Sequence, residues 1–125
     1  MATHDPEVWN SLLQQLQERT EAAKAMGGGD KIARQHSRNR QTARERIDLL
    51  CDASSFSEIG ALAGGNHPGG AAAVPADGLV GGTGRVHGCS VVVMAEDFTV
   101  KGGSIGHPNA AKRARLVRLA GEQQL

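Results

Sequence analysis

The chain has 125 residues, 17 glycines and a formal net charge of +1, which suits a single domain with a small aliphatic core. The balanced charge excludes the strong basic field expected of a protein that binds nucleic acid or an acidic membrane surface. The N-terminus, "MATHDPEVWN", carries acidic residues and no apolar h-region, so we do not expect it to act as a signal peptide, and the longest apolar run, "VVVMA", is too short to span a bilayer. Cys51 and Cys89 make neither a disulfide framework nor a zinc motif, so we expect a reduced, cytoplasmic protein.

Residues 1–29 are expected to form an N-terminal amphipathic helix with a glycine stop. Asp5 can cap this helix, and Pro6 suits its first turn. Apolar residues then recur at helical spacing and form one stripe: Val8, Trp9, Leu12, Leu13 and Leu16. The glycines at 27 to 29 end the helix.

Two further helical stretches follow. The first, with a weak period and a basic face, begins near Lys31. In the second, "TARERIDLLCD", Thr42 and Glu45 form a capping-box pattern ahead of an apolar side. The basic stretch from Lys31 to Arg46 is interleaved with Asp30, Glu45 and Asp48 and has no aromatic stacking partner, so it does not indicate a nucleic-acid site. We interpret them as a solvated helical face or a surface against another subunit.

The middle of the chain reads as a short strand, a loop and a hairpin. Ser55 to Ile59 alternates like a strand, and residues 60–76 form a Gly-, Ala- and Pro-rich loop, predicted to be mobile. The hairpin pairs Leu79–Val86 with Cys89–Ala95. Glycines at 81, 82 and 84 are expected to weaken or bulge its first strand. Its second strand is continuously apolar, which is typical of a strand covered on both faces. Both cysteines are interpreted as small buried residues.

A glycine-rich turn and a last helix, from about His107 to Ala120, end the sequence. We expect Gly121 to cap this helix. Its apolar side is predicted to hold Leu116, Val117, Leu119 and Ala120, and its wet side Lys112, Arg113, Arg115 and Arg118. A strand, turn and helix make the first two-thirds of a βαβ unit, so a partner strand is expected beyond Leu125.

Two segments carry a family resemblance: "TARERIDLLCDASSFSEIG" and "DGLVGGTGRVHGCSVVVMAEDFTVKGGSIGHPNAAKRARLVRLA". In order and spacing they resemble the start of the carboxyltransferase (β) subunit of biotin-dependent acyl-CoA carboxylases, of the propionyl-CoA and methylcrotonyl-CoA carboxylase type. The resemblance implies that residues 30–125 are an incomplete N-terminal acyl-CoA carboxyltransferase domain. The implied fold is α/β (an α+β fragment) and partly crotonase-like (ClpP/crotonase), with N-terminal helices, then β-strands and a ββα unit.

The resemblance also implies an activity, the transfer of CO2 from carboxybiotin to the α-carbon of a short acyl-CoA. The implied partners are acyl-CoA, a biotin carboxyl carrier or biotin carboxylase subunit that supplies carboxybiotin, and a homo-oligomer or fuller carboxyltransferase subunit. No covalent cofactor, metal, nucleic acid or membrane is expected. An "SGGAR"-like segment, which holds the thioester oxyanion in this family, is absent from the sequence, so we assign no catalytic residue and expect no activity from the chain alone. The alternative is a non-catalytic CoA-binding or subunit-docking module.

Candidate CoA-binding residues lie in the glycine-rich turn and the helix after it: Lys101, Gly102, Gly103, Ser104, Ile105, Gly106, Lys112 and Arg113. The free N–H groups of such a turn and the start of a helix are suited to binding anions. The same glycines also permit a tight strand-to-helix corner without any ligand, and the cations also fit a solvated helix face. Lys101 stands where propionyl-type members usually have Phe and methylcrotonyl-type members often have Lys, so the acyl group stays open. Glu96 and Asp97 are adjacent in a strand and are not expected to act as a pair.

Overall fold

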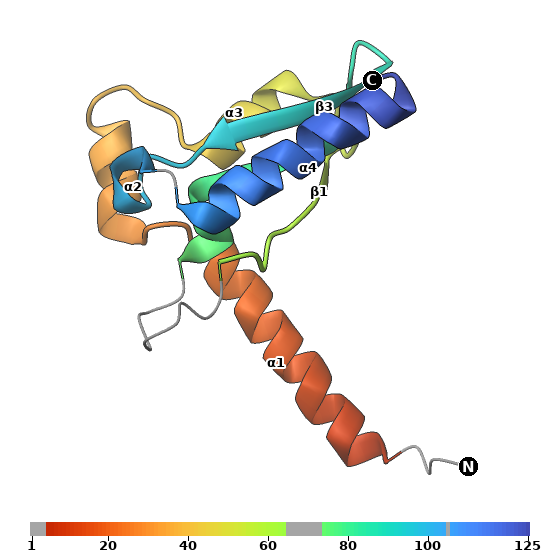
Figure 1. Ribbon diagram of the computed structural model, residues 1–125. Coiled ribbons are helices and arrows are strands. Elements are labelled where there is room, and N and C mark those ends of the chain that lie inside the picture. Colours follow the sequence, from red (N-terminus) through yellow and green to blue (C-terminus); the bar gives the residue numbers. More distant parts are fainter. Residues whose placement is uncertain (1–4, 65–73, 105) are drawn as a thin grey trace.

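The computed structural model describes residues 5–64, 74–104 and 106–125 and confirms the mixed helix-and-strand architecture. A three-stranded antiparallel sheet carries one helix on each face, and a long helix projects from one end of this body (Figure 1). The helices and strands, in chain order, are α1 (Pro6–Lys24), α2 (Gly29–His36), α3 (Ala43–Leu50), β1 (Ser57–Glu58), β2 (Leu79–Val86), β3 (Cys89–Glu96) and α4 (His107–Gln123). Two short 3₁₀ turns, η1 (Pro75–Gly78) and η2 (Lys101–Gly103), precede β2 and α4.

The helix starts follow the predicted capping chemistry. The Asp5 carboxylate accepts a hydrogen bond from the Glu7 backbone N–H at 3.0 Å, and α1 begins at Pro6. At α3, the Thr42 hydroxyl and the Glu45 side chain form both hydrogen bonds of a capping box. The predicted end of α4 at Gly121 is wrong, because the helix runs on to Gln123 and Gln124 takes the left-handed conformation that ends it.

The hairpin is regular from end to end. Partners run without interruption from Leu79 opposite Glu96 to Val86 opposite Cys89, so no bulge forms, contrary to expectation. The Asp52 carboxylate accepts hydrogen bonds from the backbone N–H groups of His87 and Gly88 at 2.9 and 2.8 Å, which holds the turn. Strand β1 is shorter than predicted, and most of the predicted loop at residues 60–76 lies outside the described residues.

Burial in the sheet is the reverse of what the composition suggests. The glycine-rich β2 is buried along most of its length, whereas in the valine-rich β3 only Val93 is fully buried. The prediction that β3 is covered on both faces is therefore wrong for this chain. The difference follows from the strand order. Strand β2 lies between β1 and β3, whereas β3 lies at the edge of the sheet and has a neighbouring strand on one side only. Cys51 is buried as expected, but Cys89, the first residue of β3, is exposed.

Helices α3 and α4 lie on opposite faces of the sheet. On one face, Ile47 and Cys51 of the α3 segment pack with Val80 and Val93 in the main apolar core. On the other face, the fully buried Leu116 of α4 lies over Gly81. A β-carbon at Gly81 would lie 2.6 Å from a Leu116 methyl carbon, so this glycine lets α4 approach the strand closely.

Helix α1 leaves this body and continues far beyond it (Figure 1). Every residue from Pro6 to Arg19 is exposed, and Ala23 is the only buried residue of the helix. The backbone N–H of Gly27, just past the helix, donates to the Thr99 hydroxyl at 2.8 Å and ties the root of α1 to the body. No helix in the described ranges is long and apolar enough to cross a membrane.

Candidate functional site

The glycine-rich turn is built on a small hydrogen-bonded base at the end of β3. The buried Asp97 carboxylate accepts from the backbone N–H of Thr99 at 2.9 Å and from its hydroxyl at 2.6 Å. The Thr99 hydroxyl oxygen in turn accepts from the backbone N–H of Gly27. Two segments 72 positions apart in the sequence therefore meet under the turn, and the chain enters the turn from a fixed position.

Three successive residues of the turn adopt left-handed conformations. The φ angles of Lys101, Gly102 and Gly103 are 45°, 62° and 81°. Lys101 is the only non-glycine residue of the three, and a residue with a β-carbon is strained in this conformation. The Lys101 side chain is exposed. Strained backbone conformations of this kind cluster at functional sites, so the turn is a candidate binding site and not only a connection between β3 and α4.

The turn offers fewer free N–H groups than predicted. The N–H of Gly103 donates to the Val100 carbonyl at 2.9 Å, and that of Ser104 to the Lys101 carbonyl at 3.2 Å. No described residue accepts a hydrogen bond from the backbone N–H of Lys101 or Gly102. These two groups and the Lys101 ammonium form the available donor set, while Ile105 lies outside the described residues.

The N-terminus of α4 was predicted to face the phosphate or thioester of CoA, but a carboxylate of this chain, that of Asp77, occupies that position. The buried Asp77 carboxylate accepts a hydrogen bond from the Asn109 backbone N–H, and the Asn109 side-chain amide donates back to the Asp77 carbonyl at 3.0 Å. The carboxylate also lies against Gly106, 3.2 Å from where a β-carbon would stand. A negative charge at a helix N-terminus is stabilising, so Asp77 meets the need that a phosphate would otherwise meet.

Lys112 is buried, and its predicted place on the wet side of the helix is wrong. Its side chain is 6% exposed, and its ammonium donates to the carbonyls of Ala76, at 3.1 Å, and Leu79. Burial lowers the pKa of Lys112, although the negative charges of Glu58 and Asp77 partly oppose this. The ammonium therefore fastens α4 to η1 and β2 and does not share a surface with Lys101.

Arg113 also lies apart from the turn. Its guanidinium forms an ion pair with Glu96 at 2.5 Å, with both side chains about one-third exposed. Glu96 is thus engaged by α4, while Asp97 supports the turn, so the two adjacent carboxylates have separate roles, as expected. Of the predicted cations, only Lys101 remains beside the glycines.

The sequence interpretation missed the residues that hold the site from beneath: Asp77, Asp97, Thr99 and Asn109. All four are polar and buried, which apolar periodicity cannot detect. Asp77 carries one usable signal, since it stands in "PADG", a composition typical of a turn that allows left-handed residues. Ala76 and Asp77 indeed have φ angles of 48° and 50°.

The available chemistry is anion binding. An exposed ammonium and two adjacent backbone N–H groups on a left-handed turn can hold a phosphate or carboxylate oxygen. Within the described ranges, no three His, Cys, Asp or Glu side chains gather where they could hold a metal ion.

Comparison with known proteins gives the chain its family. Residues 34–125 match the carboxyl transferase domain family. The methylmalonyl-CoA carboxyltransferase 12S subunit of Propionibacterium freudenreichii subsp. shermanii is 41% identical over 107 residues, which covers 80% of this chain and 20% of that protein. The propionyl-CoA carboxylase carboxyltransferase subunit of Haloferax mediterranei is 41% identical over 113 residues, which covers 88% of this chain and 22% of that protein.

Solved structures agree. The chain superposes on transcarboxylase 12S, a hexamer solved with methylmalonyl-CoA and methylmalonic acid bound, with a TM-score of 0.80 and 38% identity. That match covers 89% of this chain and 22% of the other. The chain spans about a fifth of the length of the curated relatives it matches. On its sequence and its fold, the chain belongs to the carboxyl transferase domain family.

Proposed function

We propose that this chain forms part of the acyl-CoA side of a carboxyltransferase, which transfers CO2 from carboxybiotin to the α-carbon of a short acyl-CoA. The names of its relatives, a methylmalonyl-CoA carboxyltransferase and a propionyl-CoA carboxylase, support this reaction class. The observation that carries the proposal is the exposed left-handed turn with the Lys101 ammonium beside two N–H groups. CoA carries several phosphate groups, and such a donor set suits one of them.

Within this proposal the residues of the chain have distinct parts. Lys101, Gly102, Gly103 and Ser104 form the contact with CoA, and the exposed ring of Phe98 lies against Gly103. Lys112 and Asp77 hold the base of the site and do not touch the ligand. Arg113 stays paired with Glu96, so its contribution to CoA binding is the field of a partly neutralised cation.

The net reaction breaks the bond between the biotin nitrogen and the carboxyl carbon, moves the α-proton of the acyl group to that nitrogen, and forms a bond between the α-carbon and the carboxyl carbon. Carboxybiotin, brought by a partner subunit, supplies the CO2, and we assign no described residue to hold it. The part of this chain is to hold and orient CoA, which lowers the entropy cost of the encounter. A polypeptide of these 125 residues is expected to give no turnover, because it spans about a fifth of its relatives.

Calorimetric titration with CoA tests the binding part. We expect Lys101→Glu to weaken CoA binding by about tenfold, equivalent to about 1.4 kcal/mol, because it replaces a cation at the phosphate with an anion. The matched control is Lys31→Glu, at an exposed lysine of α2. Equal weakening by the two substitutions would show a general charge effect and contradict a site at the turn.

A carboxylation assay tests the second part. The chain is mixed with a biotinylated carboxylase subunit and with propionyl-CoA or acetyl-CoA, and acyl-CoA carboxylation is followed. No product above the background is expected even when calorimetry detects CoA binding. Turnover that depends on the chain would refute the assignment of a binding part without its own catalytic groups.

A second candidate function is subunit docking, and the exposed apolar stripe of α1 favours it. Size-exclusion chromatography with a full-length relative tests this candidate directly. Coelution that survives Lys101→Glu would separate docking from CoA binding.

A further inference from the structure

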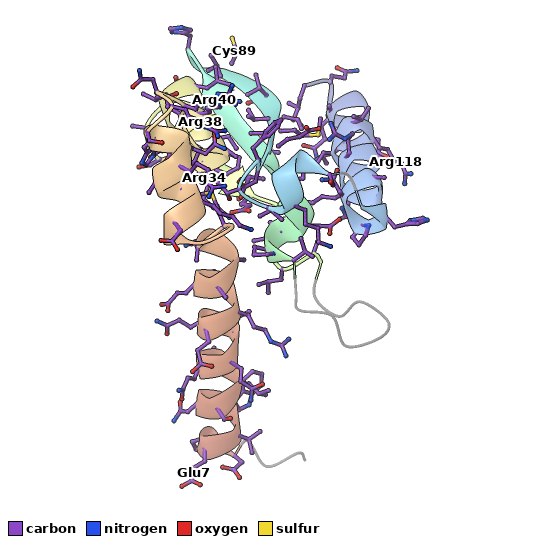
Figure 2. The ribbon with its side chains drawn as sticks, turned by 90° about the vertical axis from the view of Figure 1, so that its left-hand side faces the viewer. Glu7, Arg34, Arg38, Arg40, Cys89 and Arg118 are labelled. Atoms are coloured by element: carbon purple, nitrogen blue, oxygen red, sulfur yellow. The ribbon has the colours of Figure 1, made fainter. Side chains whose placement is uncertain are left out.

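The three glycines that join α1 to α2, where α1 meets the body (Figure 2), stand in three different settings. Gly28 has a φ angle of 94° and no described atom from elsewhere in the chain within 4 Å of where a β-carbon would stand, so its conformation calls for glycine. Gly29, the first residue of α2, has neither a left-handed φ angle nor a described neighbour within that distance. At Gly27, a β-carbon would lie 2.0 Å from the Thr99 carbonyl oxygen. Gly27 is therefore required by the close approach of another segment.

The contact between Gly27 and Thr99 is polar as well as close. The Gly27 N–H donates to the Thr99 hydroxyl oxygen at 2.8 Å, and that hydroxyl donates to the buried Asp97 carboxylate at 2.6 Å. Because the one hydroxyl proton goes to the carboxylate, the oxygen is left to accept from Gly27. Without the hydroxyl, the Asp97 carboxylate and the Gly27 N–H would each lose a hydrogen bond away from bulk water.

Residues 97–100, which we call the stem, carry this contact into the turn. On its other side the stem is held by the Asp97 N–H, which donates to the Gly78 carbonyl at 2.8 Å, and by the buried Val100 side chain, which packs beside Gly78. Lys101 follows the stem directly and has a left-handed φ angle of 45°. A strained conformation persists only where its surroundings fix it. Since the Lys101 side chain is exposed, that support comes through the backbone, and the stem supplies it.

The root of α1 has a fixed position of its own. Ala23, in the last turn of α1, is buried, and α1 contacts η1. The N–H groups of Met26 and Gly28 donate to carbonyls of the root itself, at 3.4 and 3.0 Å, whereas the N–H of Gly27 between them donates to Thr99. The root is thus held independently of the turn, and a change in its position is passed to the stem.

We propose that Gly27 and Thr99 are positioning residues of the candidate CoA site. The root of α1 braces the stem and so keeps Lys101 and Gly102 in the conformation that presents their N–H groups. This inference rests on the proposed function, since it concerns the turn to which CoA is assigned. Gly27 acts through Thr99, and Thr99 acts through the backbone of the turn, so neither residue touches CoA. A braced turn is already in its binding conformation, and less binding free energy is lost in ordering it.

Calorimetric titration of the full chain with CoA tests the brace. Gly27→Ala places a β-carbon against the Thr99 carbonyl, so the root and the stem must separate. If the binding conformation of the turn falls to between about a tenth and a third of the population, the dissociation constant rises about three- to tenfold. Gly29→Ala adds the same methyl group two positions away, into open space, and should stay within about twofold of the wild type. Equal weakening by the two substitutions overturns the proposal.

Two substitutions of Thr99 separate the shape of its side chain from its hydrogen bonds. Valine keeps the shape and lacks the hydroxyl, whereas serine keeps the hydroxyl and lacks the methyl group. We expect Thr99→Val to weaken CoA binding about three- to tenfold, as Gly27→Ala does, and Thr99→Ser to retain most of the affinity. A loss with serine as large as that with valine would assign the effect to packing and would overturn the link through the hydroxyl.

Backbone amide NMR spectra recorded without CoA separate this inference from the proposed function. Gly27→Ala and Thr99→Val should move the signals of Lys101 and Gly102 and leave those of the β2–β3 hairpin in place, which also shows that the variants are folded. If these signals move but the wild type binds no CoA, the brace stands and the proposed function fails. If CoA binds and neither variant moves the signals of the turn, the brace is overturned and the proposed function stands. Loss of the hairpin signals in both variants would assign the two residues to folding of the body and would overturn the positioning role.

Discussion

Helices α1 and α4 look alike in the sequence and pack in opposite ways. Both have a proline in the first turn and an apolar stripe, yet α1 buries only Ala23. Helix α4 buries Asn109, Lys112 and Leu116, and leaves Val117 57% exposed. An apolar stripe therefore identifies a helix but does not tell which element, or which molecule, covers it. The packed face of α4 is largely polar, and its polar groups are satisfied by specific partners.

The strongest test of this difference is Lys112→Met, which keeps the length of the side chain and removes its donors. The carbonyls of Ala76 and Leu79 would lose their partner, so we expect the free energy of unfolding to fall by about 2–3 kcal/mol in urea denaturation. The control, Lys101→Met at an exposed lysine, should change it by about 0.5 kcal/mol or less. Equal effects would mean that the polar face of α4 does not hold it to the sheet.

Asp77→Ala probes the other polar contact of that face. Loss of the carboxylate leaves the Asn109 N–H at the start of α4 without its acceptor, and we expect a loss of about 1–2 kcal/mol. Asp30→Ala, at an exposed residue of α2, serves as the comparison in the same denaturation series. If Asp77→Ala and Asp30→Ala lower the free energy of unfolding equally, the Asp77 carboxylate does not stabilise the N-terminus of α4, and that N-terminus is open to an external anion.

The pH dependence of stability follows from the Lys112 ammonium. Because burial lowers its pKa in the folded chain, the unfolded chain binds more protons on the alkaline side. Stability from this group therefore rises with pH between the folded pKa and the unfolded value of about 10.4, and is lost again as pH falls. Denaturation midpoints of the wild type should rise in that window relative to those of Lys112→Met. Parallel pH profiles would contradict the lowered pKa.

The smallest effect is expected in α1. Leu12→Ser with Leu13→Ser should change the stability of the body by about 0.5 kcal/mol or less when the chain is dilute, because both side chains are about half exposed and neither belongs to the buried core of the described residues. Urea titration followed at the amide signals of β2 separates the body from α1. Destabilisation comparable to that of Lys112→Met would show that α1 packs on the body in solution.

Local signals in the sequence predicted much of this fold. The capping residues Asp5 and Thr42 start helices where expected, and the hairpin turns at Gly88, because these features depend on neighbouring residues alone. The burial of β2 and exposure of β3 could not be predicted, since they depend on which strand is central. The glycines that seemed to weaken β2 instead admit neighbours, as at Gly81 under Leu116.

The candidate site was predictable only in its exposed part. The glycines and Lys101 stand out in the sequence because left-handed turns need particular residues. The roles of Asp77 and Lys112 depend on contacts across 32 to 36 positions of sequence, which no local pattern reports. Another such contact joins the root of α1 to the turn, since the Gly27 N–H donates to the Thr99 hydroxyl across 72 positions of sequence.

The most direct test of the account is a titration of the isotope-labelled chain with CoA, followed by the backbone amide signals in NMR spectra. If the turn binds CoA, the largest shifts should fall on Lys101 and Gly102, whose backbone amides donate to no described residue. The amides of Asn109 and Ala110, at the start of α4, should shift little, because Asp77 and Gly106 already accept from them. Shifts concentrated at Asn109 and Ala110, with Lys101 and Gly102 unchanged, would contradict it.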